Sequence, residues 1–297
     1  MLLHVMKNVV RPFYRYFKKK RLFILTNKLD LINKSSKVNI NEMSNKLDDV
    51  IVSLTTHGQR IDTVHITIES ILNGDFVPKR LILWLDNAQV YNNLPESLSR
   101  LKKRGVEIFL TKNYGPHTKY YPYIKLNLSE GYLVTADDDI IYPKNWLSLL
   151  YKYGNNKKGV IFCFRAHEIK FKETGEFDNY NLWKPCQTIL PSVKYFATGV
   201  SGVIYPPEFQ KMLYDEGEDF ISKCPKADDV WLHYVAYKND YKIQQIGKKS
   251  KHFPMVAGTE QYGLWNNNVA LNDNDNQINK TYSKYEMHDI LLRSNKK

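Results

Sequence analysis

The sequence lacks any long apolar run. No stretch reaches the ~18 apolar residues that a transmembrane helix needs, so we expect nothing that spans a bilayer. Residues 1–10 are too short and too interrupted for the apolar region of a secretory signal, and the basic cluster follows them instead of preceding them. These two absences predict a cytoplasmic protein.

Cysteine is also scarce. The chain has three, Cys163, Cys186 and Cys224, and they are widely spaced. This spacing matches neither a disulfide framework nor a paired zinc-binding motif, which argues against the small disulfide-stabilised and zinc-binding classes. Reduced thiols agree with a cytoplasmic location.

Glycine-rich phosphate-binding motifs are absent as well. The chain contains neither G-x-G-x-x-G, typical of dinucleotide enzymes, nor G-x-x-x-x-G-K-[ST], typical of P-loops. A diphosphate ligand would therefore need another device, such as a metal ion on carboxylates assisted by a lysine.

What the chain has in excess is positive charge. Its 297 residues, 43% of them hydrophobic, can bury a full core. Lys and Arg number 43 against 31 Asp and Glu, for a net charge of +12. The excess is concentrated in positions 1–21, and the small remainder requires no nucleic-acid partner. The basic residues of this segment are Lys7, Arg11, Arg15, Lys18, Lys19, Lys20 and Arg21, and no acid occurs before Asp30.

These N-terminal charges alternate with aromatic and apolar side chains, a composition typical of membrane-surface segments. Pro12 is expected to interrupt any earlier helix and to begin a short amphipathic one. Residues 33–45, rich in Lys, Asn and Ser, are interpreted as a disordered linker. We therefore predict an arm and linker over 1–46. Its residues 7–21 would bind an anionic membrane surface on the inner face of the cell membrane, and a solubilising tail is the alternative.

From about residue 48, apolar runs alternate with helical patterns. Continuous apolar strands separated by helices describe a parallel sheet covered on both faces. The predicted fold class is α/β, a Rossmann-like, mostly parallel sheet flanked by helices. Strands are expected at 50–54, 81–85, 106–110, 132–136 and 160–164, and helices at 61–72 and at 95–104, the latter ended by Gly105.

In such sheets, ligands bind outside the carboxyl ends of the strands. Polar residues follow the predicted strands there: Thr55, Thr56 and Arg60 after the first, Asp86 after the second, and an acidic triplet after the fourth. This edge of the sheet is therefore the expected binding site.

The acidic triplet, Asp137, Asp138 and Asp139, is the most informative feature of the chain. If the strand continues through it, Asp137 and Asp139 point to one side and Asp138 points away. Two convergent carboxylates make half a site for Mg²⁺ or Mn²⁺, which take their other ligands from water and phosphate oxygens. An acidic turn that caps a helix is the structural alternative.

A second acidic pair, Asp228 and Asp229, opens a helical pattern. It can act as favourable anions at a helix N-terminus, or it can supply a carboxylate that accepts a hydroxyl proton during group transfer. Upstream, Gly199, Ser201 and Gly202 are small enough to let a ligand approach the backbone, although a tight turn would need the same residues.

Four motifs, in order, resemble bacterial GT-A fold glycosyltransferases of the family 2-like group that includes capsule and lipopolysaccharide enzymes. The resemblance covers about residues 48–254. It implies a nucleotide-sugar-binding subdomain at 47–205 and an acceptor-binding subdomain with a C-terminal tail at 206–297. The motifs are 53–56 with Arg60, 115–122 with Lys119, 135–143 around the acidic triplet, and 199–207 followed by 228–232.

The resemblance implies transfer of a hexosyl or N-acetylhexosaminyl group from a nucleoside-diphosphate sugar, a UDP-sugar first of all. The acceptor would be a hydroxyl of a saccharide or lipid-linked saccharide in surface polysaccharide synthesis. Asp139, Asp137 and His252 would hold Mn²⁺ or Mg²⁺. Asp229 would be the base of an inverting displacement, with Asp228 as the alternative because the usual pattern is Glu-Asp. Donor contacts are implied at Thr55, Thr56, Arg60, Asp86, Lys119, Asp137 and Asp138, and acceptor contacts at Gly199, Ser201, Gly202, Trp231 and Trp265.

Two other functions stay open at this point. A sugar nucleotidyltransferase would also place carboxylates at strand ends, but it should have a glycine-rich basic loop after the first strand, and residues 56–60 are a poor version of one. A non-catalytic protein could bind membranes or nucleic acid through the arm, but this reading leaves both acidic motifs unexplained.

Overall fold

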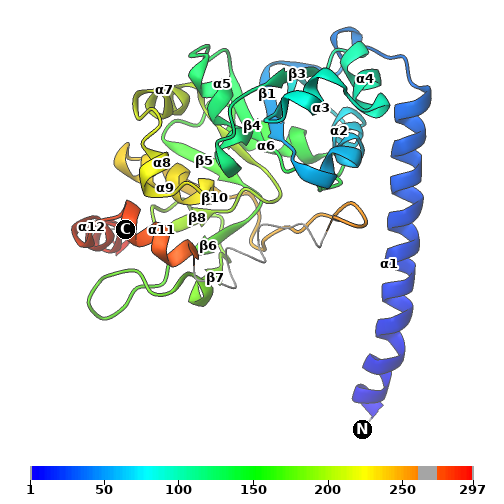
Figure 1. Ribbon diagram of the computed structural model, residues 1–297. Coiled ribbons are helices and arrows are strands. Elements are labelled where there is room, and N and C mark those ends of the chain that lie inside the picture. Colours follow the sequence, from blue (N-terminus) through cyan, green and yellow to red (C-terminus); the bar gives the residue numbers. More distant parts are fainter. Residues whose placement is uncertain (1, 260–272, 296–297) are drawn as a thin grey trace.

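The structure, a computed structural model, describes residues 2–259 and 273–295 (Figure 1). Its centre is a seven-stranded sheet in the order β10-β5-β9-β4-β1-β2-β3, in which β9 alone runs antiparallel to its neighbours. The predicted α/β fold with a mostly parallel, helix-flanked sheet is confirmed. The strands are β1 (Lys46–Thr55), β2 (Val77–Leu85), β3 (Glu107–Leu110), β4 (Tyr132–Thr135), β5 (Val160–Cys163), β9 (Val203–Tyr205) and β10 (Lys242–Gln245).

Helices cover both faces of this sheet. The expected helix at 61–72 begins later, at Val64, because a 3-10 turn precedes it, and Gly105 follows the α4 helix with φ +90° as a C-terminal glycine should. The helices are α2 (Val64–Leu72), α3 (Ala88–Asn92), α4 (Glu96–Lys103), α5 (Tyr121–Lys125), α6 (Trp146–Gly154), α7 (Pro207–Asp215), α8 (Phe220–Lys223), α9 (Asp228–Lys238), α11 (Asp273–Thr281) and α12 (Lys284–Asn295).

Short elements complete the fold. A three-stranded sheet in the order β7-β6-β8 lies beside β10. These strands are β6 (Ala166–Glu168), β7 (Lys184–Pro185) and β8 (Tyr195–Ala197), and the 3-10 turns are η1 (Ile40–Glu42), η2 (Gly58–Asp62), η3 (Gly115–Lys119) and η4 (Tyr180–Leu182).

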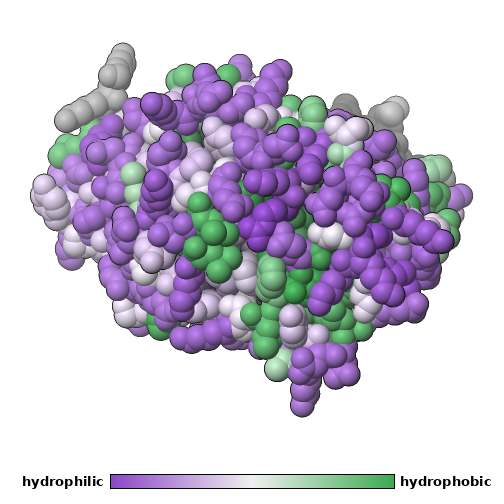
Figure 2. Space-filling view, turned by 90° about the horizontal axis from the view of Figure 1, so that it is seen from above, coloured by the Kyte–Doolittle hydropathy of each residue, from purple (hydrophilic) through white to green (hydrophobic). Residues whose placement is uncertain are grey.

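Alternate residues of the central strands feed two separate cores. In β1, Val50, Val52 and Leu54 pack with α2, α4 and α6, whereas Ile51 belongs to the core beneath α7 and α9. All four side chains are fully buried, which is why the strand reads as continuously apolar. Seen from above, the surface is largely hydrophilic with apolar side chains in limited patches (Figure 2).

The β9 strand was not anticipated. The sequence predicts a turn or a close ligand approach at 199–202, but the residues that follow, 203–205, pair antiparallel with both β4 and β5. Three residues are too few for a periodic pattern, so only pairing with neighbours reveals the strand. The predicted boundary at 205 falls between β9 and α7, although β10 from the later part joins the same sheet.

The N-terminal arm is one continuous helix, α1 (Leu2–Ser35), and its beginning extends far from the body (Figure 1). The expected interruption at Pro12 is therefore wrong. An interior proline costs a helix about 3 kcal/mol, which is why a break was expected there. No helix within the described residues combines the length and the hydropathy needed to cross a membrane.

The expected linker at 33–45 is also wrong at its start, because α1 docks on α2 and α4 there. Asn33 is fully buried, and its Nδ2 donates to Glu69 Oε1 and to the Ser97 carbonyl, each over 3.1 Å. Arg100 Nε donates to Asn33 Oδ1 over 3.0 Å. Leu29, 1% exposed, packs beside Ile66. A polar residue that looked like linker composition is thus a buried hydrogen-bonding centre.

Replacing Leu29 with alanine should lower the free energy of unfolding by about 2–5 kcal/mol, because it opens a cavity between α1 and the body. Leu31→Ala is the matched control in the same helix, since Leu31 is 63% exposed. Its cost should stay near 0.5 kcal/mol. Urea unfolding followed by circular dichroism measures both, and equal losses would show that α1 does not dock through Leu29.

Candidate active site

Three carboxylates from two distant motifs gather around Lys119, the last residue of η3. Its Nζ lies 2.9 Å from Asp137 Oδ1 and 3.2 Å from Asp228 Oδ2. Asp137 follows the end of β4, and Asp228 and Asp229 are the first residues of α9, as the sequence indicated. The parallel sheet brings these segments to one edge because their strands and helix end or begin there.

Burial by itself would lower the pKa of Lys119. The charges of Asp137, Asp228 and Asp229 outweigh that effect and hold this pKa well above its ordinary value. The lysine therefore stays an ammonium at neutral pH and compensates the three acids.

Ser53, which the sequence motifs matched without assigning a role, positions this lysine. Its Oγ donates to the Lys119 carbonyl over 2.7 Å and accepts from Trp84 Nε1 over 2.9 Å. Ser53 is fully buried near the carboxyl end of β1. A hydroxyl inside the otherwise apolar run 50–54 is the signal available in the sequence.

Asp229 is the more accessible of the two acids at the start of α9. It is half-buried, and its Oδ1 accepts a 2.9 Å hydrogen bond from Gly199 N, whereas Asp228 is 7% exposed and engaged with Lys119. Burial, and then the charge of Asp228, raise the pKa of Asp229 against the opposing effect of the lysine. A Cβ at Gly199 would lie 3.1 Å from Asp229 Oδ1, so the glycine allows this close contact.

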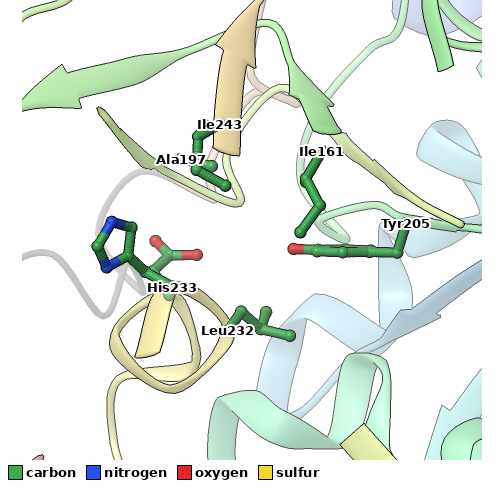
Figure 3. Close-up of a pocket in the computed structure, with 7 residues that line it drawn as sticks. Ile161, Ala197, Tyr205, Leu232, His233 and Ile243 are labelled. Atoms are coloured by element: carbon green, nitrogen blue, oxygen red, sulfur yellow. The ribbon is translucent and has the colours of Figure 1, made fainter. Parts of the chain in front are cut away.

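A small cavity lies beside Asp229 (Figure 3). Its volume is about 10 Å³, roughly the space of one water molecule. The Tyr205 hydroxyl points into it, and burial followed by the charges of Asp229 and Asp228 raise the pKa of that tyrosine. His233, also in the lining, is held by Tyr282 and the Val193 carbonyl, so its role is structural.

A second ion cluster surrounds Arg60, which is 8% exposed. Its Nη1 lies 2.7 Å from Asp138 Oδ1 and its Nη2 lies 3.0 Å from Asp139 Oδ2. Thr56 Oγ1 donates to Asp138 Oδ2 over 2.7 Å, and Thr67 Oγ1 donates to the Asp138 carbonyl over 2.9 Å. Three of the residues expected to contact the donor, Thr56, Arg60 and Asp138, are thus committed to one another.

The expected alternation within the acidic triplet is wrong. The β4 strand ends at Thr135, so the period of two does not extend through Asp137, Asp138 and Asp139. Asp138 and Asp139 both approach the guanidinium, while Asp137 faces the lysine and its N–H donates to Tyr142 Oη over 2.9 Å.

Asp137 and Asp139 fit a divalent cation in part. Burial, and then the charge of Asp137, raise the pKa of Asp139 to about 7 although Arg60 opposes the shift. The charge of Asp139 is therefore incompletely compensated by Arg60, a condition that a bound cation relieves. Mg²⁺ takes one or two protein carboxylates when phosphate and water complete its shell. Three grouped His, Cys, Asp or Glu side chains suited to a metal occur nowhere in residues 2–259 and 273–295.

His252, expected as the third metal ligand, is not brought together with the two carboxylates. The neighbouring Lys251 N donates to the Phe164 carbonyl over 3.0 Å, and Val256 N donates to the Asp139 carbonyl over 2.7 Å, so His252 lies between these two contacts. It forms no three-ligand cluster with the carboxylates among the described residues. His252 is exposed there, and burial followed by the charge of Arg165 lower its pKa.

The two remaining donor positions, Thr55 and Asp86, lie at the ends of β1 and β2 and are half-buried. Thr55 Oγ1 donates to the Trp84 carbonyl over 3.0 Å. Asp86 forms no hydrogen bond or ion pair with another described residue, so its carboxylate is available to a ligand.

Of the acceptor positions, Gly199 faces the site, and three others do not. Trp231 is 1% exposed and fully buried Ser201 donates to the Lys251 carbonyl over 2.8 Å, so neither offers a surface to a sugar. A Cβ at Gly202 would lie 2.7 Å from the Trp146 indole nitrogen, so this glycine serves packing. Trp265 lies outside the described residues.

No protein-family model and no curated protein sequence matches this chain. Solved structures resemble it at low identity. S. aureus TarS 1-349 superposes with a TM-score of 0.48 at 15% identity over 82% of this chain and 70% of that one. 4-Diphosphocytidyl-2C-methyl-D-erythritol synthase of Anaerococcus prevotii superposes with a TM-score of 0.45 at 11% identity, over 76% of this chain and 95% of that one.

GalNAc-T7, crystallised with UDP, GalNAc and Mn²⁺, gives a TM-score of 0.43 at 12% identity over 71% of this chain. The match covers 44% of GalNAc-T7, so this chain spans less than half of that protein. Each of these superpositions has a TM-score below 0.5, so none of them carries an argument about function, and the chemistry must be derived from the site.

Lys119→Met should lower the free energy of unfolding by about 3 kcal/mol or more, because it leaves buried carboxylates without their cation. The loss should be larger at pH 8 than at pH 5. The raised pKa of Asp229 means that the folded state regains a proton as the pH falls, which relieves the repulsion.

Lys125→Met is the matched control for thermal unfolding at both pH values. The Lys125 side chain is 59% exposed, and its ion pair with Glu218 lies at the surface. That control should change stability by about 0.5 kcal/mol or less. A loss for Lys119→Met that does not depend on pH would contradict the compensating role of the lysine.

Proposed function

We propose that this protein is a metal-dependent glycosyltransferase that moves a sugar from a nucleoside-diphosphate sugar to a saccharide hydroxyl. One observation carries the proposal: the acidic triplet and the acidic start of α9 meet around Lys119 at the carboxyl edge of the sheet. A metal-binding acid, a fixed cation and a separate candidate base, Asp229, are what transfer from a diphosphate requires.

Asp229 is the proposed base of an inverting displacement. It is half-buried, its Oδ1 is oriented by Gly199 N, and it lies next to the cationic site without an ion pair of its own among the described residues. A carboxyl with a raised pKa accepts a proton more readily in its ionised form. The acceptor hydroxyl gives its proton to this oxygen and attacks the anomeric carbon, and the diphosphate leaves with the bonding electrons.

Asp137 and Asp139 would hold Mn²⁺ or Mg²⁺, which when bound offsets the charge of the leaving diphosphate. Lys119 holds Asp137 in place over 2.9 Å and adds a permanent positive charge beside the leaving group. Asp86, at the end of β2 and without a side-chain partner among the described residues, is suited to accept hydrogen bonds from the nucleoside, and we propose uridine first.

The nucleotidyltransferase alternative is less well supported. Such an enzyme needs basic groups after the first strand to meet a triphosphate, and Arg60 is the basic side chain that ends the 56–60 segment. Its guanidinium is buried between Asp138 and Asp139 and so is unavailable. A transferase that uses a diphosphate sugar does not need it.

Release of nucleoside diphosphate across a panel of nucleotide sugars, with and without Mn²⁺, tests the proposal. We expect release from one of them, dependent on the metal and faster with saccharide acceptors. Release of pyrophosphate from a nucleoside triphosphate and a sugar phosphate would instead show a nucleotidyltransferase. Neither product under any condition would remove the enzymatic proposal.

Asp229→Asn should lower kcat about 100-fold or more while binding of UDP with Mn²⁺ changes by about twofold at most, because the base does not hold the donor. Single-turnover transfer and calorimetry measure the two effects. Asp228→Asn is the matched comparison. If it is the more damaging change while Asp229→Asn is near wild type, the base is the preceding residue.

The acceptor is proposed to be lipid-linked, in capsule or lipopolysaccharide synthesis, because α1 has a surface suited to an anionic membrane. Tyr16, Phe17, Phe23 and Ile24 are between 58% and 65% exposed, and exposed Lys19, Lys20 and Arg21 lie among them. Apolar and basic side chains on one helix favour the interface of an anionic bilayer. Pairing of two copies through this helix is disfavoured because their charges repel.

The triple change Lys19→Glu, Lys20→Glu and Arg21→Glu should abolish sedimentation with phosphatidylglycerol vesicles, since each basic residue contributes about 1 kcal/mol. Transfer to a short soluble acceptor should persist. Point changes are preferred to removal of α1, because Leu29 and Asn33 are part of the body.

The double change Lys157→Glu and Lys158→Glu is the control, since these lysines are exposed on the body and not on α1. It should leave sedimentation intact. Equal vesicle binding by the triple variant and the wild type would show that α1 is not the anchor.

A further inference from the structure

Arg165 is the exception among the arginines of the body. Of the arginines outside α1, all others form an ion pair with a carboxylate, but Arg165 has no such partner among the described residues. It is half-buried in the turn between β5 and β6. A guanidinium is always charged, so a half-buried one without an anion is incompletely satisfied.

Neutral and basic groups surround this guanidinium. Its Nη1 donates to Thr198 Oγ1 over 3.2 Å and its Nη2 lies 3.2 Å from His167 Nε2. His167 Nδ1 is buried without a hydrogen-bond partner among the described residues. Burial, then the charge of Arg165 and then that of His252 lower the pKa of His167. The Tyr180 ring lies 5.6 Å from the His167 ring.

The cluster adjoins the proposed base. Thr198 N donates to the Arg165 carbonyl over 3.1 Å, and the next residue, Gly199, donates to Asp229 Oδ1 over 2.9 Å. Tyr180 lies near both Arg165 and Asp229. Burial and then the charge of Asp229 raise the pKa of Tyr180, and the charge of Arg165 opposes this rise. A ligand on Arg165 would therefore lie next to the carboxylate that deprotonates the acceptor.

We propose that Arg165, His167 and His252 bind an oxyanion of the acceptor, a phosphate or a carboxylate. This inference rests on the proposed function. If Asp229 is the base, the molecule bound next to it is the acceptor. Guanidinium and imidazole N–H groups are matched to such oxygens, and the fork of Arg165 can bind two of them. The substrate class is thus an anionic saccharide. In this proposal His252 binds the acceptor and is not a metal ligand.

Calorimetry on the full chain with glucose 6-phosphate, glucuronate and glucose as probes tests the site. Glucose 6-phosphate or glucuronate should bind, and glucose should bind more weakly. Arg165→Gln should weaken the anionic probe about tenfold or more, because it removes a charge-assisted contact. Lys103→Gln, which removes one exposed positive charge of α4, should leave binding unchanged.

UDP with Mn²⁺ is titrated into the same variants to separate the acceptor from the donor. We expect Arg165→Gln to leave UDP binding within about twofold. A parallel loss of UDP binding would place the cluster in the donor site, and equal binding of the anionic probes by Arg165→Gln and wild type would also overturn the proposal. Failure of the wild type to bind either anionic probe would do the same.

Arg165→Lys guards against a variant that simply misfolds. It keeps the charge but loses the fork, so it should bind the anionic probe at a level between wild type and Arg165→Gln with an unchanged melting temperature. If Arg165→Lys binds like wild type while a folded Arg165→Gln does too, the site is excluded. If neither the wild type nor any variant binds UDP, the glycosyltransferase proposal is wrong. The titrations with the anionic probes still test whether Arg165, His167 and His252 bind an oxyanion.

Discussion

The ion pairs of Lys119 are the interaction on which the candidate site depends. Asp137, Asp228 and Asp229 come from separate segments and would repel one another without a shared cation. The sheet supplies that cation at a fixed place, because Ser53 in β1 holds the lysine backbone. Charge compensation and strand order are therefore two parts of one arrangement, and neither acidic motif could be buried to this extent alone.

The same arrangement distributes different roles among similar acids. Asp228 is tied to the lysine and nearly buried, while the half-buried Asp229 has a hydrogen bond from Gly199 and a water-sized cavity beside Tyr205. Burial and the charge of Asp228 raise the pKa of Asp229, as suits a proposed proton acceptor. Arg165, which has no carboxylate partner among the described residues, is joined to this site through residues 198–199, and we propose that it binds an anionic acceptor there.

Local sequence determined the scaffold of this protein. Strands buried on both faces read as continuous apolar runs, Gly105 has the positive φ that ends a helix, and Asp228 and Asp229 begin α9 as anions at a helix N-terminus should. Given a parallel sheet, it follows that residues after different strands meet at one edge. The acidic motifs could thus be assigned to the site from their positions after or before such elements.

Tertiary structure alone decided the partners. Asp138 faces Arg60 because β4 ends at Thr135, and polar Asn33 is buried because α1 docks on helices far along the chain. Trp231 faces the core instead of a sugar, and β9 exists only through its neighbours in the sheet. The physical reason is the same in each case. Propensity and periodicity act over a few residues, whereas burial, ion pairing and strand pairing join segments that sequence patterns leave unconnected.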